Sequence, residues 1–217
     1  MEQTPSILIE AGVAFGSGAH PSTALLLEIL GVLGPPHDGG QLLDVGCGSG
    51  ILSVTAAKLH TMQVIASDLK SSGLFKPIDP AAYTTSVGID DVLKPDFPAW
   101  RTIAAQALVT GTVTANPDGG ITLACYAYDV FAGGEIARQG FVTTAAGWRR
   151  AAHKCADLVY SRLTGEAGYF DSRIVYVSET GPRTKRIKRL AIMDQDGAGH
   201  RFLTSGQNLV LTPRFAP

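Results

Sequence analysis

The chain has 217 residues, of which 45% are hydrophobic and 17% charged, and its formal net charge is −1. This composition is typical of a globular chain of one large or two small domains. The near-zero charge gives no reason to expect nucleic acid as a partner, and the longest apolar runs are far too short to span a membrane. The start of the chain has neither the basic segment nor the apolar core of a signal peptide, so we expect a cytoplasmic protein as the sequence is written.

The cysteines support the same expectation. Cys47, Cys125 and Cys155 are odd in number and unevenly spaced. This arrangement predicts neither a disulfide framework nor a zinc site. We therefore expect reduced thiols, as in the cytoplasm.

The first quarter of the chain predicts a helix, a loop, a strand and a second helix. Apolar side chains recur at helical spacing over 22–33, and a run of glycine and proline over 34–40 ends that helix. Residues 42–45 predict a short buried strand, and a helix follows from residue 51.

Residues 62–69 have two interpretations. The segment QVIASDL is either a second buried strand or a continuation of the preceding helix towards Gly73. An apolar stripe at helical spacing crosses this region: Leu52, Leu59, Met62, Ala66 and Leu69. The stripe favours a helix through most of 51–74.

The rest of the chain, from residue 107, predicts several strands joined by turns and one amphipathic helix. Apolar and β-branched runs bounded by glycine-rich turns predict strands at 107–115, 121–130, 135–144, 173–178, 190–194 and 209–211. Residues 146–163 have one apolar face and end at Gly165, which predicts a helix.

A glycine loop follows the strand at 42–45. Asp44, Gly46, Gly48 and Gly50 have the spacing D-x-G-x-G-x-G between a strand and a helix. Glycines let the backbone approach a ligand closely, and a carboxylate at the end of a strand can accept hydrogen bonds from it. The spacing differs from the dinucleotide fingerprint G-x-G-x-x-G and resembles motif I of class I methyltransferases that use S-adenosylmethionine.

The segments AFGSGAHPSTALLLEIL (14–30) and LLDVGCGSGILSVTAAKL (42–59) resemble PrmA, the family of ribosomal-protein lysine methyltransferases, over about residues 11–69. The resemblance implies that the three glycines pack against the methionyl and ribose part of S-adenosylmethionine. It also implies that Phe15, Gly16 and His20 lie beside the methionine half, and that Asp68 is the candidate ribose acid.

The rest of the methyltransferase pattern is not found. No adenine-side acid and no substrate motif follow in the sequence. We therefore expect S-adenosylmethionine to bind weakly at most, with no tightly bound cofactor, no catalytic residues and no metal.

A second resemblance covers about residues 64–217. The segments FPAWRTIAAQALVTGTV (97–113), YDVFAGGEIA (128–137) and WRRAAHKCADLVYSRLTGEAGYFDSRIVYV (148–177) resemble TolB, the periplasmic component of the Tol-Pal envelope system. This resemblance implies an amino-terminal α/β domain followed by the start of a β-propeller. A single propeller blade cannot close a ring by itself.

Together the two resemblances predict a hybrid. We expect an α/β fold whose mixed sheet resembles that of the TolB amino-terminal domain, with a methyltransferase-like first strand and helix, and a short antiparallel β appendage. The hybrid domain covers 1–170, methyltransferase-like over 1–60 and TolB-like over 61–170, and the appendage covers 171–217.

The predicted function follows from this composition of segments. We expect an engineered or recombined chimera without a complete native function, a TolB-like domain carrying a remnant cofactor loop. The alternatives are a Tol-Pal protein-interaction domain and an S-adenosylmethionine-dependent protein methyltransferase. Tol-Pal proteins are partners by resemblance alone, and an open sheet edge predicts self-association.

Overall fold

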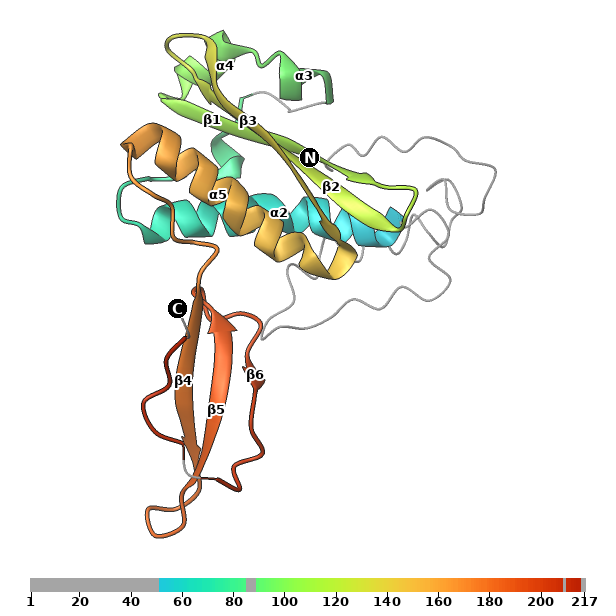
Figure 1. The fold of residues 1–217 in the computed structure, drawn as a ribbon. Helices are drawn as coiled ribbons and strands as arrows, with labels where there is room; N and C mark the ends of the chain where they lie inside the picture. The colour runs from blue at the N-terminus through green and yellow to red at the C-terminus, as the bar shows by residue number, and fades with distance from the viewer. Residues whose placement is uncertain (1–50, 85–88, 209, 216–217) are drawn as a thin grey trace. The chain divides into compact units, whose positions relative to one another are not determined.

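The structure is a computed structural model, and it describes residues 51–84, 89–208 and 210–215 (Figure 1). These residues form two compact units, which divide between Gly168 and Tyr169. The first unit contains a sheet and its helices, and the second contains a small sheet of its own.

The sheet of the first unit has three antiparallel strands in chain order. They are β1 (Ala107–Ala115), β2 (Gly120–Asp129) and β3 (Gly134–Thr144). The sequence predicted all three strands to within a residue at each end. In the register, Ala127 of β2 lies opposite both Val109 of β1 and Ala137 of β3, so these three side chains share one face.

The turns of this sheet explain why the hairpins form where they do. In the β1–β2 turn, Asp118 Oδ1 accepts the Gly120 amide at 2.9 Å, and Gly119 has φ +81°. In the β2–β3 turn, Asp129 Oδ1 accepts the amides two and three residues later, both at 2.8 Å, and Gly133 has φ +68°. Glycine adopts positive φ without a steric penalty, so both turns are encoded locally.

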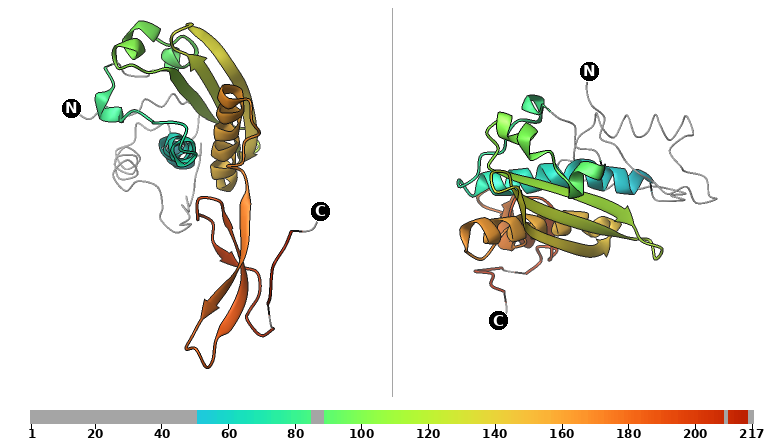
Figure 2. Two further views of the ribbon diagram at one scale, coloured as in Figure 1. Left: turned by 90° about the vertical axis from the view of Figure 1, so that its left-hand side faces the viewer. Right: turned by 90° about the horizontal axis from the view of Figure 1, so that it is seen from above.

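Two long helices cover one face of this sheet (Figures 1 and 2). They are α2 (Ile51–Ser71) and α5 (Trp148–Thr164), and α5 ends at Gly165, whose φ is +79°. Residues 62–69 therefore lie inside a helix, which confirms the helical interpretation. The buried apolar side chains of this region are Val64, Ile65 and Leu69, whereas Met62 and Ala66 of the predicted stripe are half-buried.

Pairs of side chains fix the relative direction of α2 and α5. His60 lies near the start of α5 at Trp148, with ring centroids 6.2 Å apart, and Asp68 lies against His153 further along both helices. The two helices therefore run in the same direction. Buried side chains fill the space around them: Val64, Ile65 and Leu69 from α2, and Ala151, Ala152, Ala156 and Val159 from α5.

Short helices cover part of the opposite face of the sheet. These are α3 (Ile89–Leu93) and α4 (Phe97–Thr102), and they lie on the side away from α5 in Figure 2. Trp100 of α4 is 4% exposed, and it packs with Leu108, Ala105, Tyr128 and Val130.

Hydrogen bonds fasten this segment to the sheet. The hydroxyls of Thr110 and Tyr128 both donate to the Val92 carbonyl, at 3.1 and 2.9 Å. Arg101 Nε donates to the Val130 carbonyl at 2.9 Å. Because buried polar groups are satisfied in this way, the connection between α2 and β1 is held at defined points of the sheet.

The second unit contains β4 (Arg173–Thr180), β5 (Ile187–Asp194) and β6 (Arg201–Phe202), all antiparallel. Glu179 of β4 lies opposite Lys188 of β5 and forms ion pairs with Lys188 at 2.8 Å and Arg186 at 3.0 Å. These contacts lower the pKa of the Glu179 carboxyl, the hydrogen bond from Lys188 being the largest cause.

The strand predicted at 209–211 is wrong for residues 210 and 211, which are in no strand, while residue 209 lies outside the described residues. The third strand of this unit is β6 instead. A tight turn follows Asp194, whose amide and carbonyl bond to Ala198 and Gly197 at 2.8 and 2.9 Å. This turn sends the chain straight back along β5, so the pairing strand comes earlier than the apolar pattern indicated.

The α/β fold class and the short antiparallel appendage are confirmed. The methyltransferase-like strand at 42–45 lies outside the described residues.

Candidate functional site

Most of the residues that the sequence predicts to bind a cofactor lie outside the described residues. These are Phe15, Gly16, His20, Asp44, Gly46, Gly48 and Gly50. Their assignment to the methionine and ribose parts of S-adenosylmethionine stays a prediction. Asp68 is the member of the predicted site that the structure describes.

Asp68 lies in the interior of α2 and faces α5. Its Oδ2 is 2.6 Å from Nδ1 of His153, and each side chain is 1% exposed. An ionised carboxylate can only accept hydrogen bonds, so the Nδ1–H of His153 donates to it. The pair joins two helices across 85 residues of sequence.

This geometry gives the Asp68 carboxylate a protein partner in a dry environment. A ribose acid of the methyltransferase type sits at the exposed tip of a strand, whereas Asp68 lies within a helix. The role of Asp68 towards a cofactor stays a prediction, and its described contact is structural.

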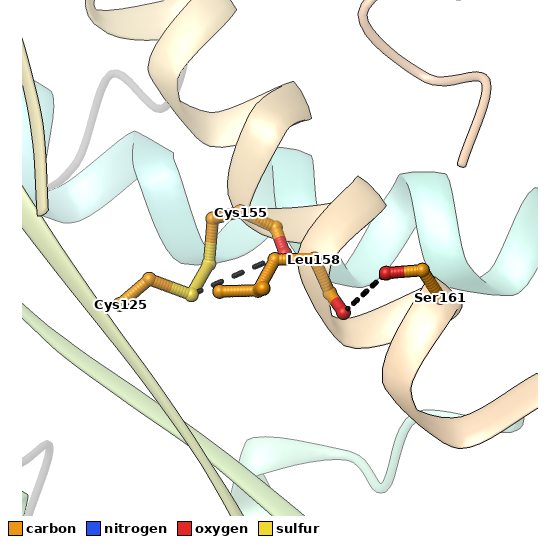
Figure 3. Close-up of a disulfide and its surroundings, with 4 residues drawn as sticks. All are labelled: Cys125, Cys155, Leu158 and Ser161. Atoms are coloured by element: carbon orange, nitrogen blue, oxygen red, sulfur yellow. Dashed lines mark hydrogen bonds between the residues drawn. A yellow bond between two sulfur atoms is a disulfide. The ribbon is translucent and has the colours of Figure 1, made fainter. Parts of the chain in front are cut away.

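A disulfide joins β2 to α5. Cys125 and Cys155 are bonded, with their Cα atoms 5.9 Å apart, and each residue is 1% exposed (Figure 3). The expectation of three reduced cysteines is therefore wrong. Cys125 points towards the helices because its strand position alternates with outward-facing neighbours, and Cys155 lies on the buried face of α5.

The sequence contained a pattern that indicates this disulfide, but the number and spacing of the cysteines did not reveal it. Cys125 shares the inward face of its strand with Ile121 and Leu123, and Cys155 shares the apolar stripe of its helix with Val159. Two cysteines on faces that must pack together are candidates for a bond, even in a chain with an odd number of cysteines.

The disulfide is flanked by strand β2 on the Cys125 side and by α5 on the Cys155 side. Ser161 Oγ donates to the Leu158 carbonyl at 3.0 Å one turn beyond Cys155, as Figure 3 shows. Cys125 Sγ lies 4.0 Å from the Cys155 carbonyl oxygen. A disulfide sulfur carries no proton, so this second approach is a contact in the oxidised protein.

His60 is a second buried histidine near the start of α5. Burial lowers the pKa of His60 from its ordinary value of 6.5, and the hydrogen bond to Gln63 opposes this shift. The neutral ring is therefore the form that the folded protein favours.

A shallow recess lies between β3 and the start of α5. Its volume is about 280 Å³, and it is lined by residues 140–143, Arg150, Ala151 and Lys154. Ligand pockets commonly have about 300–1,000 Å³ and apolar walls. This recess is small and partly cationic, so it does not have the character of a cofactor pocket.

Two family models match different parts of the chain. The model of the TolB amino-terminal domain matches residues 50–136, and that of ribosomal protein L11 methyltransferase (PrmA) matches residues 2–74. The two matches overlap over 50–74, which includes all of α2. The sequence-based resemblance to both families is confirmed.

Curated relatives extend the TolB similarity to a longer part of the chain. The chain is 65% identical over 154 residues to the Tol-Pal system protein TolB of Rhizorhabdus wittichii and 63% identical over 154 residues to that of Zymomonas mobilis. Each alignment covers 71% of this chain, but 35% and 33% of the relative. The chain thus spans about a third of the length of the curated relatives it matches.

A solved structure has the same fold. The crystal structure of TolB from Acinetobacter baumannii superposes with a TM-score of 0.61 and 25% sequence identity, covering 70% of this chain and 37% of that one. Within the described residues, no helix combines the length and the apolar character that a membrane span needs.

Proposed function

We propose that this chain is a non-catalytic protein-interaction domain of the Tol-Pal type whose front quarter derives from a PrmA-like methyltransferase. The observation that carries the proposal is the 65% identity over 154 residues to a Tol-Pal system protein, beside a PrmA match that ends at residue 74. The hybrid domain covers 1–170 and the β appendage 171–217. A join made by engineering or by recombination accounts for both matches.

The geometry of α2 supports a join within this helix. One helix of 21 residues lies wholly within the segment 50–74 that both family models match. Its later half buries Val64, Ile65 and Leu69 and sets Asp68 against His153. The first part of a helix can come from one family and the second part from another. The helix still docks if the apolar side chains of both parts lie on one face.

The same helix argues against methyl transfer. In a class I methyltransferase, the segment around Asp68 is a strand that ends in the ribose acid. Here the segment is helical and the carboxylate is 1% exposed. The loop with Asp44 and the three glycines is then a remnant, with at most weak affinity for S-adenosylmethionine.

The partners follow from the relatives. Tol-Pal envelope proteins are the proposed binding class, and the net charge of −1 gives no reason to add nucleic acid. Pairing of two copies through an open sheet edge of the β appendage is a further expectation.

The disulfide supports a location in the cell envelope in preference to the cytoplasm. Disulfides persist in oxidising compartments such as the bacterial periplasm, and cytosolic thiols are kept reduced. The expectation of a cytoplasmic location relied in part on reduced cysteines. The disulfide between Cys125 and Cys155 removes that support.

Two measurements test the proposal. Isothermal titration with S-adenosylhomocysteine should give no dissociation constant tighter than about 1 mM, because each buried polar group without a partner costs about 1–3 kcal/mol. A micromolar constant that is lost in Gly46→Val and in Asp44→Ala would restore the methyltransferase alternative.

The second measurement addresses the binding role. Biolayer interferometry with the purified Tol-Pal proteins of Rhizorhabdus wittichii should detect binding to at least one of them. An unrelated periplasmic protein of similar size and charge serves as the control ligand. Equal signals for all proteins would contradict the Tol-Pal assignment.

A further inference from the structure

The disulfide is buried within the first unit. Cys125 and Cys155 are each 1% exposed, and the residues around them on α5 are as inaccessible, with Ala152 and Ala156 at 0% and Val159 at 1%. The bond therefore sits under a packed helix, where no reagent in solution reaches either sulfur.

We infer that the Cys125–Cys155 disulfide, which we call the latch, forms before α5 finishes docking on β2. The docked helix then shields the disulfide from exchange with thiols in solution. Thiol–disulfide exchange needs an attacking thiolate in contact with a disulfide sulfur, so access limits both formation and loss of the bond. With both sulfurs covered, the oxidant must act while α5 is still away from the sheet. Once docked, the bond reopens only when α5 separates from β2. This inference does not depend on the Tol-Pal assignment.

The closing step requires a disulfide donor, namely an oxidised thiol–disulfide oxidoreductase. One cysteine thiolate attacks a sulfur of the donor disulfide, which forms a mixed disulfide and releases one donor thiolate. The second cysteine, as its thiolate, then displaces the other donor sulfur. In total, two protein thiols become one disulfide, and the donor disulfide is reduced to a dithiol that takes up the two protons and two electrons.

Cys47 is an alternative partner for Cys125 during folding. It precedes Cys125 by 78 positions in the printed sequence, so a Cys47–Cys125 bond can form before the native one. In the native bond the Cα atoms of Cys125 and Cys155 are 5.9 Å apart.

The test measures the rate of reduction of the full chain by dithiothreitol, with free thiols alkylated at intervals and counted by mass spectrometry. In native buffer, the bond should be lost roughly 100-fold or more slowly than in denaturing urea, because reduction waits for opening of the helix. Peptide mapping of the starting material should show Cys125 linked to Cys155. A rate of disulfide reduction in native buffer within about threefold of the rate in urea would contradict the inference that docked α5 shields the bond.

Matched variants at a buried and an exposed position of α5 test whether packing of this helix limits the rate of reduction. Val159→Ala removes packing beneath the helix and should speed native reduction about tenfold, whereas Leu163→Ala, at a side chain 38% exposed, should change it less than about twofold. Equal rates in the two variants would contradict opening of α5 as the gate.

Cys47→Ser controls for attack from within the chain. The variant should be reduced at the wild-type rate if the sealed bond is inaccessible to Cys47. A wild-type chain that exchanges quickly, beside a slow Cys47→Ser variant, would show that the docked helix does not protect the bond. The comparison of wild type in buffer and in urea stands even if a packing variant fails to fold.

Discussion

Replacing Asp68 by alanine tests the central contact between α2 and α5. The substitution removes the carboxylate that accepts the Nδ1–H of His153 at 2.6 Å. Both side chains are 1% exposed, so water cannot take the place of the lost group without opening the interface. The cost should therefore appear in the free energy of unfolding of the first unit.

The expected magnitude follows from the burial. Removing one partner of a buried ion pair costs about 3–5 kcal/mol, and removing one partner of a buried neutral hydrogen bond costs about 1–3 kcal/mol. We expect Asp68→Ala to lose about 3 kcal/mol. Asp68→Asn keeps an oxygen that can accept the same N–H, so its loss should be smaller, about 1–2 kcal/mol.

Urea denaturation followed by tryptophan fluorescence measures this change. The chain has two tryptophans, Trp100 and Trp148, and both lie in the first unit. Lys70→Ala, at an exposed position of the same helix, is the matched control and should change stability by less than about 0.5 kcal/mol.

One result would refute the reasoning. If Asp68→Ala lowers the free energy of unfolding by no more than Lys70→Ala does, Asp68 does not join the two helices. An Asp68 at the tip of a methyltransferase-like strand would behave in that way. A double variant with His153→Leu gives the coupling directly, since the double change should cost clearly less than the sum of the two single changes.

Three further predictions concern the disulfide, a buried histidine and the second unit. Cys125→Ala combined with Cys155→Ala opens a loop of 30 residues and should lower the free energy of unfolding by about 3.5 kcal/mol, with a loss below about 1 kcal/mol in urea denaturation contradicting the expected role. Because burial depresses the pKa of His60 below 6.5, the unfolded chain binds its proton first as pH falls. Stability should therefore drop below about pH 6.5, and His60→Gln should flatten that part of the profile of thermal midpoint against pH. Removing residues 180–217 should leave a cooperative thermal transition in calorimetry, because the sheet and helices of the first unit are built from earlier residues; a broad, non-cooperative melt would show that the first unit needs the appendage.

The sequence by itself determined the local elements of this protein. Asp118 and Gly119 encode the first hairpin turn through a side-chain bond and a positive φ, which depend on adjacent residues only. The apolar stripe through 62–69 favoured a helix over a strand at the junction of two family resemblances, because its spacing is helical, and the structure has a helix there.

Only the tertiary structure decided which side chains meet. The partners in the Asp68–His153 pair are 85 residues apart, and those in the Cys125–Cys155 bond are 30 apart. Spacing along the chain does not bring such groups together. The docking of α5 onto α2 and β2 does, and it places Asp68, a predicted cofactor residue, in a contact between two helices and joins two expected thiols in a disulfide. The same physics placed β6 at Arg201–Phe202, where the turn after Asp194 returns the chain along β5.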